Sequence, residues 1–437
     1  MLGSLRNAFK IPDLRNKILF TLAMFAVYRL GGHIPLPGIN TSALASFFET
    51  ARATALGLYD IFVGGGLSSG AIFGLGIMPY ISASIILQLL GAAMPYYQKL
   101  QKEGEEGRRK INQHTRYLTI GIAAIQALGV CIFLESAQAP SGELVVINPG
   151  LSFRLLSIIT LITGTLFIMW LGELITDRGI GNGISLIIMI GIIARFPRDF
   201  ITTFNMVRIG AMSPIAAVVT VIVIIGIIAA VVIITQAQRR VPVQYAQRVI
   251  GRKIYGGRST HLPLNVNAAG IIPIIFAQAV LTFPATIARF FSSSDWVQTF
   301  VAFFSPMNWL YNIIYASLIV FFAYFYTAVI LNPIDIADNM KKYGGFIPGV
   351  RPGKSTADYI DRIISRITLP GALFFALVAI VPAIILHKLN APFVFGGTSV
   401  LIVVGVALDT MRQIEAQLTM RHYDGFLRKG KIRGRRG

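Results

Sequence analysis

The sequence predicts an all-α integral membrane protein with ten transmembrane helices. Of its 437 residues, 54% are hydrophobic and 13% are charged, whereas soluble domains carry about 25% charged residues. The uncharged residues form long runs, and about 20 apolar residues of helix are enough to cross the hydrocarbon core. The net charge of +20 lies between these runs, which is typical of cytoplasmic loops rather than of a nucleic-acid-binding domain.

Ten apolar segments are long enough to be spans. The clearest is IAAVVTVIVIIGIIAAVVII, in which Thr220 is the only polar side chain. The fifth segment is the weakest, because Arg195 and Arg198 interrupt it after a short run. The predicted spans lie near residues 18–36, 72–94, 117–136, 155–174, 180–200, 214–235, 268–290, 310–331, 367–387 and 392–411.

Basic residues set the orientation of these spans. With the N-terminus inside, most of the 39 Lys and Arg residues fall in cytoplasmic segments, as the retention of positive charge predicts. Both termini are then cytoplasmic. Five spans in each half would invert the second half relative to the first, although the halves share no convincing sequence similarity. The predicted parts are a cytoplasmic N-terminus, an N-terminal half, a C-terminal half and a basic cytoplasmic tail, at 1–17, 18–212, 213–411 and 412–437.

A glycine-rich segment precedes the second span and ends in LYDIFVGGGLSSGAIFGLGIMP. It is too short and too broken to cross a bilayer fully. Irregular backbone survives at membrane depth only inside protein or beside a water-filled cavity. Residues 56–70 are therefore either a re-entrant half-helix or an external surface loop.

The sequence offers no enzyme site. The stretch GGFIPGVRPGKST at 344–356 ends like a phosphate-binding loop, but Gly349 and Gly353 are one residue too close together for that motif. Pro352 also removes a backbone N–H donor. The five histidines have no metal-ligand spacing, and Cys131 is the only cysteine. We therefore expect no catalytic residue, no cofactor and no bound metal.

The predicted spans carry almost no charge near their centres. Ion-coupled transporters usually keep ionisable groups there, so this pattern argues against such a carrier. An apolar constriction can gate a pore without charge. Ile77 and Ile81 share one helix face, as do Ile184 and Ile188, but side-chain packing and lipid contact account for the same spacing.

Six stretches together give a resemblance to a known family. They are GIMPYISASIILQLL (76–90), EGEEGRRKINQHTRY (103–117), DRGIGNGIS (177–185), YGGRSTHLPLNVNAAGIIPIIFA (255–277), GGFIPGVRPGKST (344–356) and FGGTSVLIVVGVALD (395–409). In this order, and over nearly the whole chain, the sequence resembles the bacterial SecY family, the central subunits of the Sec protein translocase channel.

The resemblance implies two pseudo-symmetric inverted halves around a central pore, with a short re-entrant plug helix at 56–70. The pore would pass unfolded secretory polypeptides across the membrane and release membrane segments sideways. The residues implied for the plug are Tyr59, Phe62, Gly64, Gly65 and Gly66, and those implied for the pore ring are Ile77, Ile81, Ile188, Ile275 and Ile402. Glycines held by few packing contacts would let the plug move at low cost.

The resemblance also implies a lateral gate and two docking loops. Gln88 and Asn267 are candidate gate residues, although ordinary polarity at span ends would explain them equally well. The loops at 236–267 and 332–366 would dock the motor SecA or the ribosome, through Arg252, Lys253 and Arg351. No role is assigned to Lys354.

Further partners follow from the same resemblance. SecE would clamp the halves and SecG would be an accessory subunit, while signal-bearing preproteins and membrane lipids would meet the channel directly. SecA, translation or the proton-motive force would supply energy, and the expected location is the bacterial inner membrane.

The competing hypotheses are a secondary transporter with inverted repeats, which requires a substrate site at the midplane, and a membrane enzyme.

Overall fold

The computed structural model describes residues 9, 11–50, 55–245, 248–250, 253–255, 259–290, 308–388 and 397–429. The chain divides into two compact units, and each is described by itself. Unit 1 comprises Met1–Arg198, Ala285–Gln298 and Val406–Gly437, and unit 2 comprises Asp199–Pro284 and Thr299–Gly405. The predicted division into halves at residues 212 and 213 stays a prediction.

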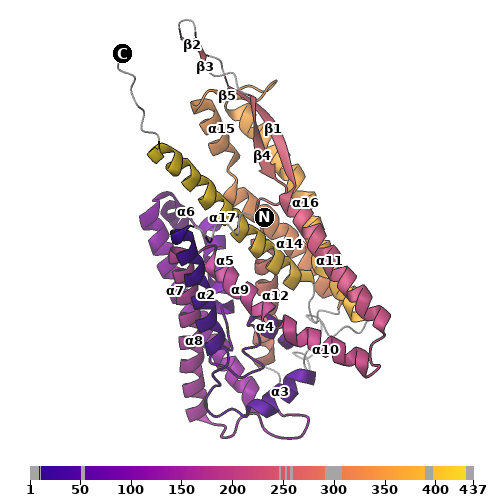
Figure 1. Cartoon of the computed structure of the whole chain (residues 1–437). Coiled ribbons are helices and arrows are strands. Elements are labelled where there is room, and N and C mark those ends of the chain that lie inside the picture. The colour runs from indigo at the N-terminus through magenta and orange to yellow at the C-terminus, as the bar shows by residue number, and fades with distance from the viewer. Residues whose placement is uncertain are drawn as a thin grey trace. The chain divides into compact units, whose positions relative to one another are not determined.

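Unit 1 is built from helices (Figure 1). In chain order they are α2 (Pro12–Gly31), α3 (Thr41–Thr50), α4 (Ala55–Phe62), α5 (Met78–Ala93), α6 (Pro95–Lys102), α7 (Glu105–Ser136), α8 (Leu151–Arg178) and α9 (Gly183–Ile193). The start of α10 (Phe196–Arg208) and the C-terminal part of α17 (Gly397–Lys429) also belong to it. In the C-terminal part of α17, Ile414 packs with Leu14 of α2 and with Ile180 in the turn between α8 and α9, and all three side chains are buried.

Local chemistry explains two features of unit 1. The axes of α5 and α6 differ by 97°, because Pro95 follows Met94 and forces it into an extended conformation that ends α5. Ion pairs join α7 and α8 at both ends, where Arg116 contacts Glu173 and Arg154 contacts Glu135. In both pairs two guanidinium nitrogens bind the carboxylate, which fixes geometry more firmly than a single contact.

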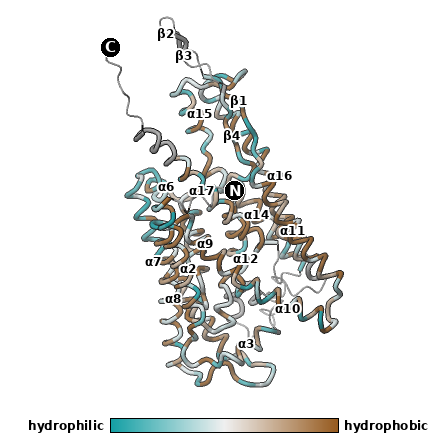
Figure 2. Tube along the Cα trace, viewed as in Figure 1, coloured by the Kyte–Doolittle hydropathy of each residue, from teal (hydrophilic) through white to brown (hydrophobic). Residues whose placement is uncertain are grey.

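Unit 2 combines helices with a small sheet. Its elements are the rest of α10, then α11 (Pro214–Gln236), β1 (Gln238–Tyr245), β2 (Arg248–Ile250), β3 (Lys253–Tyr255), β4 (Ser259–Asn265), α12 (Ile272–Phe290), α14 (Trp309–Ile330), α15 (Pro333–Lys342), β5 (Gly345–Phe346), α16 (Lys354–Lys388) and the start of α17. In the most apolar 18-residue stretch of α11, only 17% of the residues are buried. Figure 2 shows this helix as hydrophobic along its length.

The sheet has the strand order β4-β1-β5. β1 pairs antiparallel with β4, with Val241 opposite Leu262 and Val243 opposite Thr260, and β5 pairs with the other edge of β1. Val241 and Val243 point inward on alternate positions, as the two-residue period of a strand requires. The sequence prediction contained no strands in this region, so the sheet is an addition to the all-α description.

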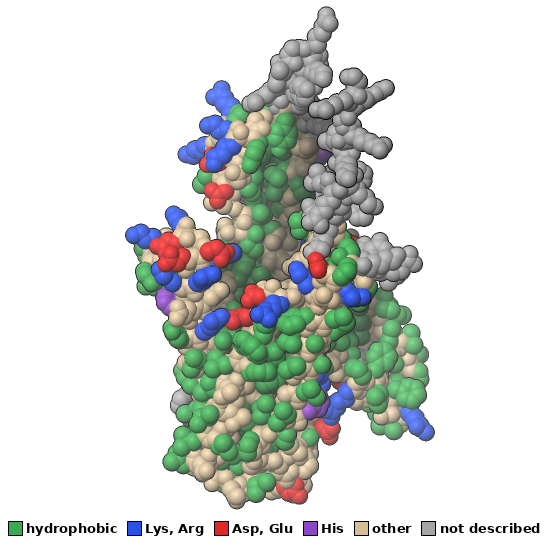
Figure 3. Space-filling model, turned by 60° about the vertical axis from the view of Figure 1, so that its left-hand side comes forward, with side chains coloured by type: hydrophobic (Ala, Val, Ile, Leu, Met, Phe, Trp, Pro, Cys, Tyr) green, Lys and Arg blue, Asp and Glu red, His purple; other side chains and the backbone are tan. Residues whose placement is uncertain are grey.

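Helices stand at all ten predicted span positions, namely α2, α5, α7, α8, α9, α11, α12, α14, α16 and α17. Among the described residues, six helices are long and apolar enough to cross a membrane, and the bent pair α5–α6 makes seven if it is one span. The chain is therefore a multi-pass membrane protein, and a total of ten spans is consistent with the structure. The fifth position holds the short helix α9, which ends at Ile193, just before Arg195. On the face drawn in Figure 3, charged side chains gather apart from a broad hydrophobic expanse.

Candidate functional site

The glycine-rich segment of unit 1 is a short helix followed by tight turns. Helix α4 ends at Phe62, and the chain then turns through residues 63–77 before α5 begins. Gly64, Gly65 and Gly70 have positive φ angles of 74°, 85° and 59°, which side chains other than glycine rarely adopt. Residues 56–62 of the predicted half-helix at 56–70 are helical and residues 63–70 form turns, while its re-entrant position and its role as a plug stay predictions.

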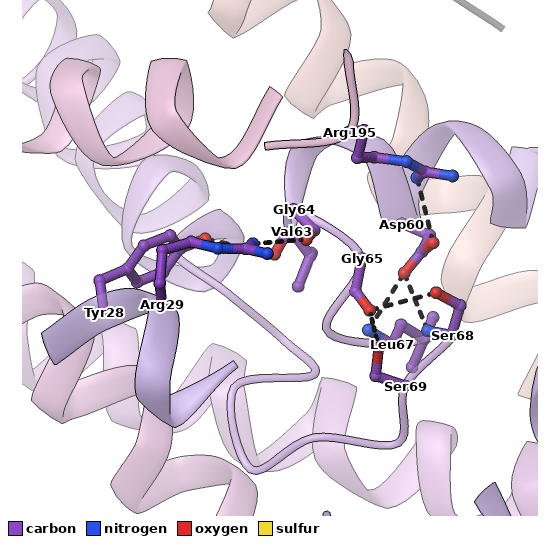
Figure 4. A network of polar contacts seen from close by, with 10 residues as sticks. All are labelled: Tyr28, Arg29, Asp60, Val63, Gly64, Gly65, Leu67, Ser68, Ser69 and Arg195. Atoms are coloured by element: carbon purple, nitrogen blue, oxygen red, sulfur yellow. Dashed lines mark hydrogen bonds and ion pairs between the residues drawn. The ribbon is translucent and has the colours of Figure 1, made fainter. Parts of the chain in front are cut away.

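Asp60 organises these turns from within (Figure 4). Its Oδ1 accepts hydrogen bonds from the backbone N–H groups of Leu67, at 3.1 Å, and Ser68, at 2.8 Å. Its Oδ2 lies 3.1 Å from Nη1 of Arg195, just beyond the end of α9. The side chain of Asp60 is 2% exposed and that of Arg195 is 17% exposed, so this ion pair is shielded from water.

Helix α2 holds the same turns from another side (Figure 4). The hydroxyl of Tyr28 donates to the carbonyl oxygen of Val63 at 3.2 Å, and Nη1 of Arg29 donates to that of Gly64 at 3.3 Å. Within the segment, the hydroxyl of Tyr59 donates to the carbonyl oxygen of Leu75 at 3.0 Å. Irregular backbone has no ladder of its own, so these side chains satisfy carbonyls that would otherwise be buried unpaired.

The premise of easy displacement, that few packing contacts hold the segment, is wrong for this conformation, while the cost of displacement stays a prediction. Tyr59, Ile61, Phe62, Val63 and Leu67 are each at most 5% exposed. Moving the segment would therefore expose apolar side chains and break several polar contacts. The glycines supply the backbone shape of the turns, whereas the side chains of Tyr59 and Phe62 supply packing.

The predicted ring residues are all buried. In unit 1, Ile77, Ile81 and Ile188 are 2 to 3% exposed, and in unit 2, Ile275 is 7% and Ile402 is 0% exposed. Ile77 immediately precedes α5 and Ile81 lies one turn later, since its N–H donates to the carbonyl oxygen of Ile77 at 3.1 Å. Lipid contact is thus excluded as the explanation of these positions, and the ring across the two units stays a prediction.

The two predicted gate residues belong to different units. Gln88 of α5 is half-buried and donates to the hydroxyl of Ser84, one turn earlier, at 3.0 Å. Asn267 is half-buried in the turn between β4 and α12. Their pairing in a gate stays a prediction.

The two predicted docking loops of unit 2 form one structure. β1 in the first loop pairs with β5 in the second, with Gln244 opposite Phe346 and Tyr245 opposite Gly345. A shared core contains Val241, Val243, Leu264, Met340, Ile347, Ile360 and Ile364. Sequence reasoning missed this pairing, because its partners lie about 100 residues apart.

The structure describes two of the three predicted docking residues. Arg351 is exposed between β5 and α16, as is Lys354 at the first position of α16. Lys253 begins the strand β3, and Arg252 lies outside the described residues. Within the described part of the chain, no group of three or more His, Cys, Asp or Glu side chains could hold a metal ion.

Comparisons with known proteins identify relatives along the whole chain. A family model described as SecY matches residues 71–411. The "Protein translocase subunit SecY" of Aquifex aeolicus is 48% identical over 97% of this chain and 99% of its own, and that of Escherichia coli strain K12 is 44% identical over 97% and 96%.

Solved structures share the fold at lower sequence identity. The structure described as "The structure of a protein conducting channel" has a TM-score of 0.64 and 19% identity, and covers 92% of both chains. "Sec61 in the Canine ribosome-channel complex from the endoplasmic reticulum" has a TM-score of 0.61 and 17% identity, with the same coverage.

Proposed function

This chain belongs to the SecY family, and we propose on that basis that it is the central subunit of a protein-conducting channel. The channel passes unfolded secretory polypeptides across the membrane and releases membrane segments sideways into the bilayer. The observation that carries this proposal is the identity of 44 to 48% with translocase subunits over 97% of the chain. The chain itself performs no chemical step and acts as a passive pore, driven by SecA, the ribosome or the proton-motive force.

The proposed pore is closed by an apolar ring and by the segment at 56–70. Ile77, Ile81, Ile188, Ile275 and Ile402 form the ring. Branched apolar side chains fit around a moving peptide without hydrogen-bonding it, and an apolar constriction resists continuous water when the peptide is absent. Their burial supports this assignment. The segment carrying Tyr59, Phe62, Gly64, Gly65 and Gly66 is the plug of the resting state.

The proposed lateral gate includes Gln88 and Asn267. Polar side chains between membrane helices contribute modest interaction energies, about 0.6 kcal/mol on average. A seam held by such contacts closes the resting channel, and a hydrophobic signal helix entering it favours the open state. The half-burial of both side chains is compatible with this role.

The proposed partners bind at separate surfaces. SecE and SecG complete the channel within the membrane, and SecA or the ribosome docks on the cytosolic sheet through Arg252, Lys253 and Arg351. Ribosome-bound channels among the structural relatives support the second surface. The chain resides in the bacterial inner membrane with both termini in the cytoplasm, the orientation that its basic loops favour.

The test uses vesicles that contain this chain with a SecE-type partner. SecA, ATP and a signal-bearing preprotein are added, and protease-protected preprotein is measured. ATP-dependent protection is expected, with about a tenfold loss in Arg351→Glu because the cationic contact to an acidic motor surface is reversed. Lys354→Glu is the matched control, since it makes the same charge change at an exposed position three residues away, and it should retain protection.

Two results would contradict the proposal. Protection that is equal in Arg351→Glu and Lys354→Glu would keep the channel but remove the docking role of Arg351. Absence of protection from a folded wild-type complex would overturn the channel itself and favour the transporter.

A further inference from the structure

The ion pair between Asp60 and Arg195 joins the glycine-rich turns to α9. The two residues are 135 positions apart, so the pair is a tertiary link rather than a local turn contact. Both oxygens of Asp60 are engaged, one by two backbone N–H groups and the other by the guanidinium. Loss of the whole Asp60 side chain would therefore affect both the shape of the turns and their attachment to Arg195.

The burial of this pair makes each charge depend on its partner. A charged group that is removed from water is stable only with a partner, and loss of one partner from a buried pair is strongly destabilising. Asp60 is 2% exposed, whereas Arg195 is 17% exposed and lies nearer to water. Loss of Arg195 should therefore do more harm than neutralisation of Asp60, because it leaves the carboxylate as the deeply buried unpaired charge.

A close backbone contact places the same turns against α9. A Cβ atom added to Gly64 would lie 2.8 Å from the Cα of Gly191 in α9. The approach to α9 thus combines a glycine-to-glycine contact at Gly64 with an ion pair from Asp60 in α4 to Arg195, just beyond α9. The segment and α9 are fitted to each other at two separate points.

We propose that Asp60 and Arg195 form a latch that holds the plug segment on α9 in the resting channel. The inference rests on the proposed function, because it takes residues 56–70 as the plug. Asp60 positions the turns through its bonds to Leu67 and Ser68, and Arg195 supplies the charge that keeps the buried carboxylate in place. Opening the channel requires this pair to separate, so the pair sets how often the resting pore opens without a substrate.

The experiment measures how often the plug segment leaves its site. Ser68→Cys is nearly isosteric and keeps the backbone N–H that Asp60 binds, and the rate of its labelling by a membrane-impermeant maleimide reports exposure of the segment. Cys131, the only native cysteine, is fully buried, so its labelling in the same sample reports general loosening. Chloride efflux from vesicles that contain the complex measures the leak through the pore.

Four variants separate the charge pair from other effects. Arg195→Ala should raise the labelling rate of Ser68→Cys about 100-fold, because it leaves the carboxylate unpaired. Arg195→Lys keeps the charge and can keep the single contact to Oδ2, so its rate should stay within about threefold of the wild type. Asp60→Asn should raise the rate by only about tenfold, since its amide oxygen can still accept from Leu67 and Ser68. The double variant Asp60→Asn with Arg195→Ala should resemble Asp60→Asn alone, because no buried charge is left unpaired.

Several outcomes would overturn the latch. The first is an unchanged labelling rate of Ser68→Cys in Arg195→Ala, and the second is an equal rate in Arg195→Ala and Arg195→Lys. The third is a double variant whose rate reflects the simple addition of the two single effects. The fourth is labelling of Cys131 that rises in parallel with that of Ser68→Cys. Chloride efflux should rank the variants in the same order, and a different order would also count against the latch. Preprotein protection in the wild type is measured beside these assays: its absence overturns the proposed function, whereas its presence with an unaltered Arg195→Ala variant overturns only the latch.

Discussion

The glycine-rich turns of unit 1 and the small sheet of unit 2 are both irregular in sequence, yet different interactions stabilise their backbones. The turns after α4 have almost no regular structure, and their carbonyl and N–H groups are bound by Tyr28, Arg29 and Asp60. The sheet satisfies its backbone through strand pairing and packs Val243 and Ile360 into an apolar core. Turns that lack strand pairing need side chains to bind their buried backbone groups, whereas paired strands bind one another.

This difference predicts unequal responses to substitution. In the sheet, stability should depend on apolar volume. In the glycine-rich turns, it should depend on backbone conformation, charge pairing and close contacts. Three substitutions test the contrast, from the largest expected effect to the smallest.

The largest effect is expected in the core of the sheet. Ile360→Ala removes a side chain that is 0% exposed, and should destabilise the sheet by about 2–5 kcal/mol through lost burial and a residual cavity. Hydrogen exchange of the amides in β1 and β5 measures the loss. Tyr359→Ala is the control, because its side chain is 36% exposed. Equal exchange in the two variants would mean that the apolar core does not hold the sheet together.

The next effect is the difference between two substitutions in the glycine-rich turns. Gly64→Ala and Gly65→Ala both place a side chain at positive φ, at a cost of about 1–2 kcal/mol each. Only at Gly64 does the added Cβ meet neighbouring backbone, 2.8 Å from Gly191, whereas at Gly65 the nearest atom is 3.9 Å away. Gly64→Ala should therefore cost about 1–3 kcal/mol more, measured as faster labelling of Ser68→Cys. Identical rates would show that the contact with α9 contributes nothing.

The smallest effect is expected from an exposed ion pair of the same unit. Glu49 and Arg198 are 3.4 Å apart, with side chains that are 61% and 62% exposed. Exposed pairs contribute about 0–1 kcal/mol, and salt weakens them further. Glu49→Gln should shift the midpoint of heat unfolding by no more than about 1 °C. By contrast, Asp60→Asn should clearly raise the rate at which Ser68→Cys is labelled. A large, salt-sensitive shift from Glu49→Gln would remove the distinction between buried and exposed pairs.

The sequence was most informative where one physical rule acts along the chain. Hydropathy located all ten helices at the predicted span positions, and Arg195 already marked the early end of the fifth. The same arginine also indicated a buried ion pair that was not predicted, since a cation that interrupts a membrane span needs a partner. Nothing local pointed to Asp60, because the two residues meet only after folding.

The sheet was missed for a related reason. A two-residue strand such as β5 carries no periodic signal, and its partner β1 is about 100 residues away. The roles of the ring, gate and docking residues came from resemblance alone, since isoleucines at helical spacing are equally suited to ordinary packing.

The strand pairing between β1 and β5 has a mechanical consequence. β1 starts two residues after α11 ends, and β5 starts three residues after α15 ends, while β4 leads through Asn267 toward α12. Because the strands are hydrogen-bonded to one another, a force applied at Arg351 cannot stay in its own loop. We expect such a force to reach the ends of α11, α12 and α16 that adjoin the sheet, so that these three helices respond together.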